Sequence, residues 1–540
     1  MDKFWILLLV TFFPFCGHSY AQLNRKLPVV QTLNGKLQGT NESGVKVFKG
    51  VPFAAPPVGD LRWKEPRPVK DWTGIRKADK FGSRPVQANV FGDMNFRSDS
   101  MSEDCLYLNV WTPAKTGNEK LPVLVYFYGG GLIAGSGDEP RYAGKSMARK
   151  GIVAITVNYR LGIFGFLAYP GLTKESPNHS SGNYGYLDQN AALKWIKKNV
   201  RAFGGDPDRI TVAGESAGSI SVSAQMASPL SKGLFEQAIA SSGSVMGALP
   251  SIPLKEAEEQ GVKMAGQLGA KNLKQLRAMS ATELLRAKGR FAGNIDGYFM
   301  PKAPEKIYSE GQQLKVPMLI GWNSQEMTYP YLIGSQKPTL SNIHVYLEKR
   351  FGKQADRIMK IYGFTSEGSV IPASTQLASD LFIAFSTWKW SDMEAESSSL
   401  PVYRYHYCHP RPAMVLKGKE SGLAGGVKDI KKDKNAGVHR DKGAVHSSDI
   451  EYAMGNLPTN RIYDWQPEDY EVAAVFQSYY ANFIKTGNPN GLGLIDWPAV
   501  NGKAVPPVLQ LDVNCVVTRD SQLQQRYEVM NSILYSSQTR

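Results

Sequence analysis

The chain has 540 residues, of which 42% are hydrophobic, 11% aromatic and 21% charged. This composition excludes a disordered or collagen-like chain, and the lack of a linker-like stretch or fixed-period repeat favours one large domain with long insertions. The formal net charge is +15 at pH 7, but the sequence contains no nucleic-acid-binding motif and no dense basic helix. We therefore expect no nucleic-acid partner, and only attraction to acidic surfaces or acidic substrates.

The first residues have the pattern of an export signal. Lys3 gives a short positive start, residues 4–15 are apolar but too few to span a bilayer, and Ala21 suits cleavage after a small residue. We therefore predict a signal peptide over residues 1–21, with an uncleaved anchor as the alternative. The mature chain, residues 22–540, is expected to be secreted or periplasmic, to form a single domain and to insert into no membrane.

Short apolar runs alternate along the chain with segments whose apolar residues recur at helical spacing. This alternation predicts an α/β fold with a mostly parallel central sheet and helices on both faces. In chain order we expect strands over 121–128 and 152–159, a helix over 187–200, a strand over 210–213, a helix over 217–227, strands over 237–241, 316–321 and 402–407, and a helix over 468–485. Between the last two, residues 411–442 are rich in lysine and glycine and predict a long, basic, mobile loop.

Residues 214–218 form a Gly-x-Ser-x-Gly pentapeptide between an expected strand and an expected helix. So sharp a turn needs small neighbours and exposes the serine hydroxyl, while the helix start provides backbone N–H groups where negative charge develops. This context predicts a catalytic nucleophile at Ser216 rather than an ordinary serine in a tight turn.

A serine nucleophile needs a base and an acid that orients the base, and in this kind of fold they follow in the chain order serine, acid, histidine. His446 lies in a small-residue loop after a late strand and is the predicted base, with His439 as its rival. Glu326 follows the expected strand over 316–321 and is the predicted acid. Asp449 is too close to His446 in sequence to orient it, and we expect it to cap a helix locally.

Three glycines, residues 129–131, directly follow the expected strand over 121–128. Without side chains, neighbouring backbone N–H groups can point at one oxygen. We expect the N–H groups of Gly130 and Gly131, together with that of Ala217, to form an oxyanion hole. No pair of histidines has the spacing of a helical zinc site, so neither a metal nor a cofactor is expected.

The cysteines do not suggest a disulfide scaffold. Cys16 would leave with the signal peptide, and Cys105, Cys408 and Cys515 would remain. An odd number in an exported chain leaves at least one thiol unpaired. Whether Cys408 and Cys515 pair with each other stays open.

Together these motifs resemble the type B carboxylesterase family, which includes the cholinesterases, from about Val29 to the C-terminus. The resemblance implies an α/β-hydrolase fold, with Ser216, Glu326 and His446 as catalytic triad and Gly130, Gly131 and Ala217 as oxyanion hole. It is carried by residues 48–54, 56–59, 102–109, 128–131, 158–162, 203–207, 214–218, 443–449, 486–491 and 497–498.

The chain departs from the family pattern at two places. Family members usually pair the cysteine at the position of Cys105 with an upstream cysteine, but residues 81–87 contain none, which implies a free, buried thiol. No tryptophan lies between residues 81 and 105, where cholinesterases hold a quaternary ammonium group, and Met246 with small residues replaces the tryptophan that often narrows the acyl pocket. The resemblance therefore implies a roomy acyl pocket and argues against a choline esterase.

The sequence thus predicts a serine hydrolase that cleaves carboxylic esters through an acyl-enzyme intermediate. A catalytically silent binding or adhesion protein on the same fold, like the neuroligins, is the alternative. We expect a small-molecule or carbohydrate-linked ester as substrate. Residues 411–442 end just before His446 and so reach the rim of the site, where they are either a solvated surface or a means of capturing anionic esters.

Overall fold

The computed structural model describes residues 27–92, 94–423, 426–429, 443–502 and 505–535, so the predicted signal peptide lies outside it. An 11-stranded mixed sheet runs through the centre in the order β20-β19-β16-β15-β12-β11-β9-β10-β8-β4-β3. The strands from β19 to β10 are parallel, and antiparallel strands flank them at both edges. The bounds are β3 (Thr40–Glu42), β4 (Val45–Pro52), β8 (Tyr107–Thr112), β9 (Leu121–Phe127), β10 (Val153–Val157), β11 (Gly205–Glu215), β12 (Gln237–Ser241), β15 (Met318–Asn323), β16 (Val402–Tyr407), β19 (Val508–Leu511) and β20 (Val516–Thr518).

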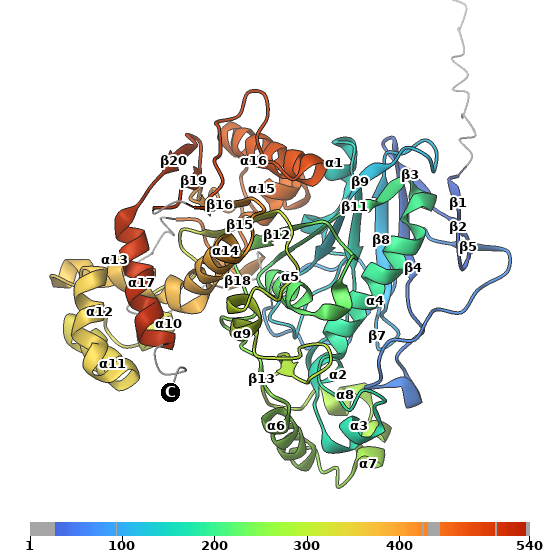
Figure 1. The fold of residues 1–540 in the computed structure, drawn as a ribbon, viewed down its shortest axis with the longest axis horizontal. Helices are drawn as coiled ribbons and strands as arrows, with labels where there is room; N and C mark the ends of the chain where they lie inside the picture. Colours follow the sequence, from blue (N-terminus) through green and yellow to red (C-terminus); the bar gives the residue numbers. More distant parts are fainter. Residues whose placement is uncertain (1–26, 93, 424–425, 430–442, 503–504, 536–540) are drawn as a thin grey trace, which may run out of the picture.

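Helices cover both faces of the parallel strands (Figure 1). Helix α5 (Ala217–Ala227) packs against β9, β11 and β12, and α16 (Pro467–Thr486) packs against β9 and β11 from the opposite face. The burial of strand β10 agrees with this arrangement. Every one of its residues is buried, as expected for a strand of a parallel sheet that has helices on both faces. This architecture confirms the predicted α/β fold, and β12, β16 and α5 have the predicted bounds.

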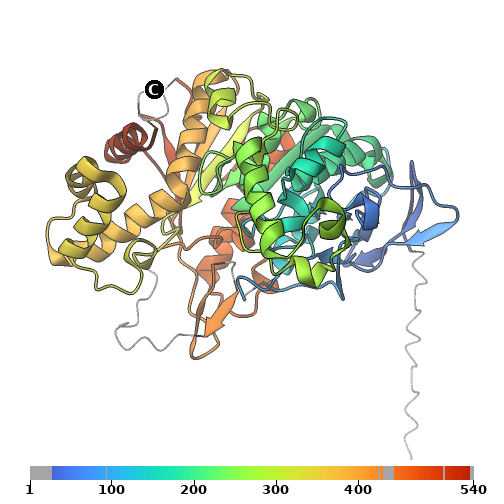
Figure 2. The same cartoon turned by 90° about the horizontal axis from the view of Figure 1, so that it is seen from below.

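Two long insertions between strands of the sheet form helical lobes beside it (Figures 1 and 2). One follows β12 and holds α6 (Leu254–Gln267), α7 (Leu273–Ala278) and α8 (Ala281–Leu284), which share an apolar cluster with residues such as Trp63 and Phe164. The other follows β15 and packs together with the C-terminal helix α17 (Ser521–Tyr535) around a second apolar cluster. It contains α10 (Pro330–Ile333), α11 (Leu340–Phe351), α12 (Ala355–Tyr362), α13 (Val370–Ser379) and α14 (Phe385–Ser397). Among the described residues, no helix combines the length and the apolar character needed to cross a membrane.

The region predicted as one long loop, residues 411–442, contains a short hairpin instead. Strands β17 (Lys419–Ser421) and β18 (Val427–Asp429) pair antiparallel. Sequence reasoning missed the pairing because the strands are only a few residues long and carry no alternation of polar and apolar residues. Residues 430–442, with His439 among them, lie outside the described residues.

The strand order creates one crevice that suits a ligand. After β9 the chain forms β10 on one side of that strand and later β11 on the other. The segments leaving the carboxyl ends of β9 and β11 therefore diverge, and open α/β sheets bind ligands at such a switch point. Residues 129–131 follow β9 here, and Ser216 follows β11.

Candidate active site

Ser216 occupies a strained turn between β11 and α5. Its backbone has φ = 55° and ψ = −122°, a left-handed conformation that residues with side chains rarely adopt. Glycines on both sides make the turn possible. A Cβ atom on Gly214 would lie 2.4 Å from the carbonyl carbon of Gly218, and one on Gly218 would lie 2.0 Å from the carbonyl oxygen of Phe127. The pentapeptide glycines are thus required by packing, and the turn holds the hydroxyl at the end of the sheet.

His446 connects Ser216 to Glu326. Its Nε2 lies 2.9 Å from the Ser216 hydroxyl oxygen, and its Nδ1 lies 2.6 Å from Oε2 of Glu326. A carboxylate only accepts hydrogen bonds, so the Nδ1–H donates to Glu326 and leaves Nε2 free to accept from the serine. The structure therefore brings together the three residues predicted from sequence, in the geometry of a base held between a nucleophile and an acid.

The loops that carry Glu326 and His446 are bonded to one another. The backbone N–H of Gln325 donates to the carbonyl of Ala444 at 2.9 Å, and the Asn323 side chain donates to the carbonyl of Val445 at 2.9 Å. Glu326 is fixed in turn, because its Oε1 accepts from the backbone N–H of Asn323 at 2.6 Å and from the Ser242 hydroxyl. Acid and histidine thus share one support at the end of β15, although 120 residues separate them in sequence.

The predicted oxyanion-hole residues lie beside Ser216. Gly130 and Gly131 have φ values of 109° and 63°, and a Cβ atom on Gly130 would lie only 2.2 Å from the carbonyl oxygen of Ala134. Ala217 is the first residue of α5, so its N–H lacks a partner within the helix. All three line the same cavity as Ser216 and His446. This placement gives backbone donors beside the nucleophile.

The cavity has a volume of about 260 Å³ and is mostly apolar. Phe382 stands edge-on to the His446 ring, with the centroids 5.1 Å apart. It comes from a π-helical turn, Asp380–Ala384, between α13 and α14. Sequence reasoning missed this contribution because a π-turn has no distinct residue pattern. The apolar lining residues are Phe91, Ile220, Ala248, Leu249, Tyr331, Phe382, Ile383 and Leu423.

Leu423 brings the hairpin of residues 419–429 to the site. It lines the cavity, and its carbonyl accepts a hydrogen bond of 3.1 Å from the Ser447 hydroxyl. Part of residues 411–442 therefore reaches the cavity, whereas their C-terminal end, which the sequence predicted at the rim, lies outside the described residues. The part that reaches the cavity does so through a leucine and its backbone.

Glu215, the residue before the nucleophile, is a second acid at the histidine. Its Oε1 lies 3.3 Å from His446 Nε2, and both side chains are buried. Burial raises the pKa of Glu215 to about 8. Burial acts to lower the pKa of His446, but the Glu215 and Glu326 carboxylates outweigh it and raise that pKa to about 9. The negative charge of Glu215 thus favours the protonated form of His446. The pentapeptide motif gives no signal for this, since its second position accepts any residue.

Asp449 is not the local cap that its position suggested. It precedes α15 (Ile450–Met454), but its side chain makes no capping hydrogen bond. Instead it is buried and accepts from the Asn323 side chain and from the Tyr405 hydroxyl, both at 3.3 Å. Burial, reinforced by the charge of Glu326, raises its pKa to about 6. Asp449 thus supports the loop that carries Glu326 through its hydrogen bond with Asn323.

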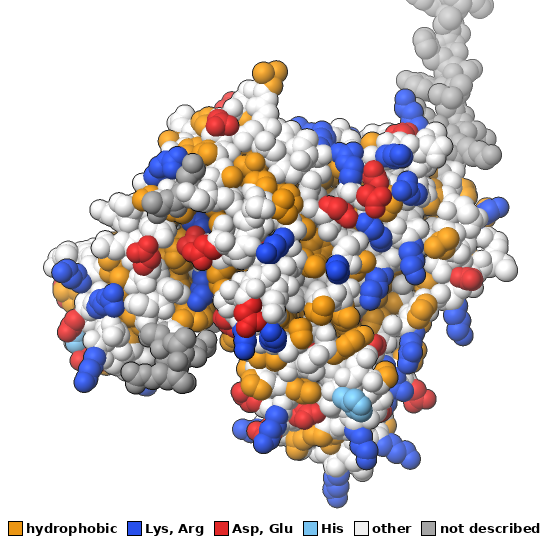
Figure 3. Space-filling view, viewed as in Figure 1, with side chains coloured by type: hydrophobic (Ala, Val, Ile, Leu, Met, Phe, Trp, Pro, Cys, Tyr) orange, Lys and Arg blue, Asp and Glu red, His pale blue; other side chains and the backbone are white. Residues whose placement is uncertain are grey.

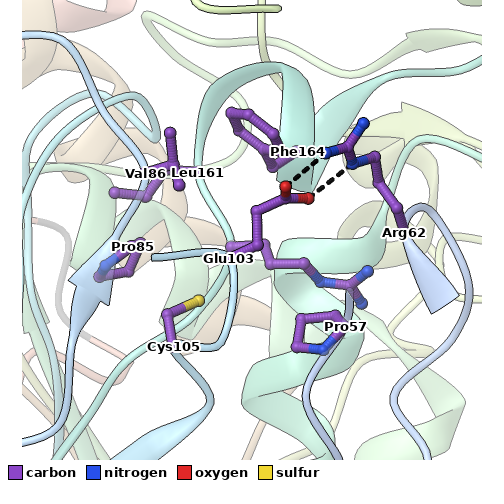
Figure 4. A pocket seen from close by; sticks show the side chains of 9 residues that line it. Pro57, Arg62, Pro85, Val86, Glu103, Cys105, Leu161 and Phe164 are labelled. Carbon is purple, nitrogen blue, oxygen red and sulfur yellow. Dashed lines mark hydrogen bonds and ion pairs between the residues drawn. The ribbon is translucent and has the colours of Figure 1, made fainter. Parts of the chain in front are cut away.

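Cys105 is buried and unpaired, as predicted, and burial raises its pKa. Figure 4 shows its sulfur directed into a small cavity that Pro85 and Val86 also line, next to the ion pair between Arg62 and Glu103. Residues other than cysteine therefore stand where the family pattern would place a disulfide partner. Cys408 and Cys515 are also free, which answers the question that the sequence left open.

Comparisons with known proteins identify the family of the chain. The sequence model of the carboxylesterase family matches residues 26–530. Fumonisin B1 esterase of Sphingopyxis macrogoltabida is 34% identical over 511 residues, covering 88% of this chain and 85% of that protein. Para-nitrobenzyl esterase of Bacillus subtilis is 31% identical over 526 residues, covering 93% and 99%. Among solved structures, a Geobacillus stearothermophilus carboxylesterase superposes with a TM-score of 0.78 at 28% identity, covering 93% of this chain and 99% of the other.

The Glu215 carboxylate should control the pH at which the site becomes active. Replacing Glu215 with Gln removes a negative charge beside His446 Nε2, so the imidazolium loses stabilisation and the pKa of His446 falls. We expect the acid limb of the kcat/KM profile to move to lower pH by about 1 unit or more. Asp449→Asn, whose charge acts from farther away, should give a smaller shift. An unmoved acid limb in Glu215→Gln would show that the histidine does not sense this acid.

The thiol of Cys105 should be reduced but inaccessible. We expect maleimide to modify Cys105 only after the protein is unfolded, and to the same extent with and without a reductant. Peptide mapping by mass spectrometry measures this. A disulfide between Cys105 and either Cys408 or Cys515 would contradict the structure.

Proposed function

The chain belongs to the carboxylesterase family and is a serine hydrolase of carboxylic esters, and on that premise we propose that Ser216, His446 and Glu326 carry out the reaction. The observation that supports these roles is the continuous line of hydrogen bonds from the Ser216 hydroxyl through the imidazole to Glu326. The relatives compared with it are named as esterases, so nothing favours the catalytically silent alternative.

In the proposed mechanism, the Ser216 oxygen attacks the ester carbonyl carbon while His446 Nε2 takes its proton. The negative charge that forms on the carbonyl oxygen is stabilised by the N–H groups of Gly130, Gly131 and Ala217, each contributing about 3 kcal/mol to lowering the barrier. Glu326 stabilises the imidazolium, which then protonates the leaving alcohol. Water, activated by the same histidine, attacks the acyl-enzyme and releases the acid and the free serine.

The proposed substrate is a small-molecule or carbohydrate-linked ester that carries negative charge. The net charge of +15 and the lysine-rich segment next to His446 support this, because a positive rim raises the local concentration of anionic substrate. The largely apolar cavity of about 260 Å³ supports an ester with an apolar portion near the scissile bond.

We also propose that the protein acts outside the cytoplasm, as a secreted or periplasmic enzyme with residues 22–540 as one domain. The support is the N-terminal pattern alone, in which Lys3, an apolar run and Ala21 follow the order of a signal peptide. N-terminal sequencing of the exported protein tests this directly, and a mature chain beginning at Gln22 is the expected result.

Loss of the nucleophile or the base should abolish turnover without unfolding the protein. We expect Ser216→Ala and His446→Ala each to lower kcat by about 10⁴-fold or more, because the two residues act as a unit. Ser309→Ala, at an exposed serine, is the matched control and should keep full activity. Thermal unfolding monitored for each variant separates lost chemistry from lost structure, and an active Ser216→Ala enzyme would end the proposal.

Capture of anionic esters should depend on salt. For an anionic and a neutral ester with the same scissile bond, we expect kcat/KM of the anionic one alone to fall about threefold or more between about 0.02 M and about 0.3 M NaCl. The fall should shrink when Lys428, Lys431, Lys432 and Lys434 are changed to Gln. Equal salt profiles for both esters would leave this segment as solvated surface.

A further inference from the structure

Arg141 is a buried cation in the wall of the active-site cavity. It belongs to a 3₁₀ turn, Pro140–Tyr142, and is 6% exposed. Among the described residues that line the cavity of Ser216, it is the only lysine or arginine. It also borders an adjoining cavity of about 240 Å³, which is lined by Arg461 and also by Glu139 and Glu451. A negatively charged group in either space would meet this guanidinium.

The hydrogen bonds of Arg141 leave part of its guanidinium unused. Nε donates to Oε2 of Glu139 at 3.2 Å, and Nη1 donates to the Ser447 hydroxyl at 3.4 Å. In the part of the chain that the structure describes, Nη2 makes no hydrogen bond. An arginine whose only role is to neutralise a carboxylate binds it most strongly through two parallel N–H donors. Arg141 donates to Glu139 through Nε alone, so it does not form that bidentate pair. Arg141 therefore retains a charged donor for a ligand.

The other acids near Arg141 are directed at other partners. Glu451 pairs with Arg411 at 2.7 Å, and Glu215 lies 3.3 Å from His446 Nε2. Glu451 is thus paired with another arginine, whereas Glu215 lines the same cavity as Arg141. On the face seen in Figure 3, lysines and arginines are scattered among acidic residues, so surface charge there does not select anionic ligands. A cation in the cavity wall is a more specific receptor, because burial reduces both screening by salt and competition from water.

Arg141 is placed on the histidine side of the cavity. Ser447 directly follows His446, and its hydroxyl accepts from Arg141 and donates to the carbonyl of Leu423. Arg141, Ser447 and Leu423 therefore form one stretch of wall beside the base. Phe382 provides an apolar surface against the same imidazole. A substrate can thus place an apolar portion against Phe382 while a charged group reaches Arg141.

We propose that Arg141 binds a carboxylate of the substrate through its free Nη2 edge and so selects esters that carry a carboxylate away from the scissile bond. This inference rests on the proposed function, ester hydrolysis at Ser216. The carboxylate can belong to the acyl part or to the alcohol part of the ester, and the adjoining cavity provides room for the remainder of either. Arg141 is then a specificity-determining residue that acts on binding, whereas the nucleophile and base act on the bond.

Two matched pairs of esters test this proposal. Mono-4-nitrophenyl glutarate against 4-nitrophenyl butyrate places the carboxylate on the acyl part, and 4-carboxyphenyl butyrate against phenyl butyrate places it on the alcohol part. We expect Arg141→Gln to lower the anionic-to-neutral ratio of kcat/KM at least about tenfold in one pair, as the loss of a charged hydrogen bond should. The pair affected tells which part of the ester carries the charge.

As a control, a positive charge is removed at an exposed position outside the active-site cavity. Arg286→Gln, at an exposed arginine just after α8, should leave both ratios unchanged. Because Arg141 makes a direct contact, its effect should persist at about 0.5 M NaCl, where surface attraction is screened. Unchanged ratios in Arg141→Gln would overturn the proposal, while continued hydrolysis of the neutral esters through Ser216 would leave the proposed function intact.

A second measurement avoids dependence on one variant, in case Arg141→Gln does not fold. In the unmodified enzyme, glutarate should inhibit hydrolysis of 4-nitrophenyl butyrate competitively, and neutral glutaramide should not. Arg141→Lys, which keeps the charge but loses the planar donor edge, should weaken glutarate inhibition several-fold. Equal inhibition by glutarate and glutaramide would contradict a carboxylate site.

Discussion

The active site depends on a single strained turn. Ser216 is held at a positive φ because β11 must enter α5 without a loop, and the surrounding packing leaves no space for side chains at Gly214 or Gly218. Such strain costs on the order of 1–3 kcal/mol, which the buried sheet around it must offset. The proposed nucleophile therefore lies on rigid secondary structure, and its hydroxyl and the N–H of Ala217 are fixed relative to one another. A rigid support of this kind is what positions a catalytic group accurately.

The rest of the site is assembled around that turn by contacts between distant segments. The acid loop after β15 and the histidine loop are joined by a backbone hydrogen bond and by the Asn323 side chain, so Glu326 and His446 share one support. The glycines after β9 approach from the neighbouring strand. The insertions after β12 and β15 add the apolar walls, Phe382 among them. The sheet thus holds the chemistry and the insertions shape the space for substrate, which is how one fold serves many substrates.

Local pattern was enough to predict some parts of this arrangement. Strands β12 and β16 have the bounds predicted for them, and the small residues around Ser216 fit the sharp turn that the pentapeptide predicted. Chain order then identified Glu326 and His446. By contrast, Arg141 and Phe382 reach the site through packing between segments far apart in sequence, and no local signal marks them. Asp449 was misassigned for the same reason, because its partners Asn323 and Tyr405 lie on neighbouring strands. Glu215 lies within the pentapeptide, but the motif does not specify the residue at that position.

The proposed role of Ser216 is that of a nucleophile made reactive by His446. Labelling with a fluorophosphonate, followed by peptide mapping, tests this role, because the reagent bonds to a serine oxygen only where a base activates it. We expect one labelled residue, Ser216, in the folded protein, and loss of that label in His446→Ala. Labelling at a different serine, or equal labelling of Ser216 without His446, would contradict it.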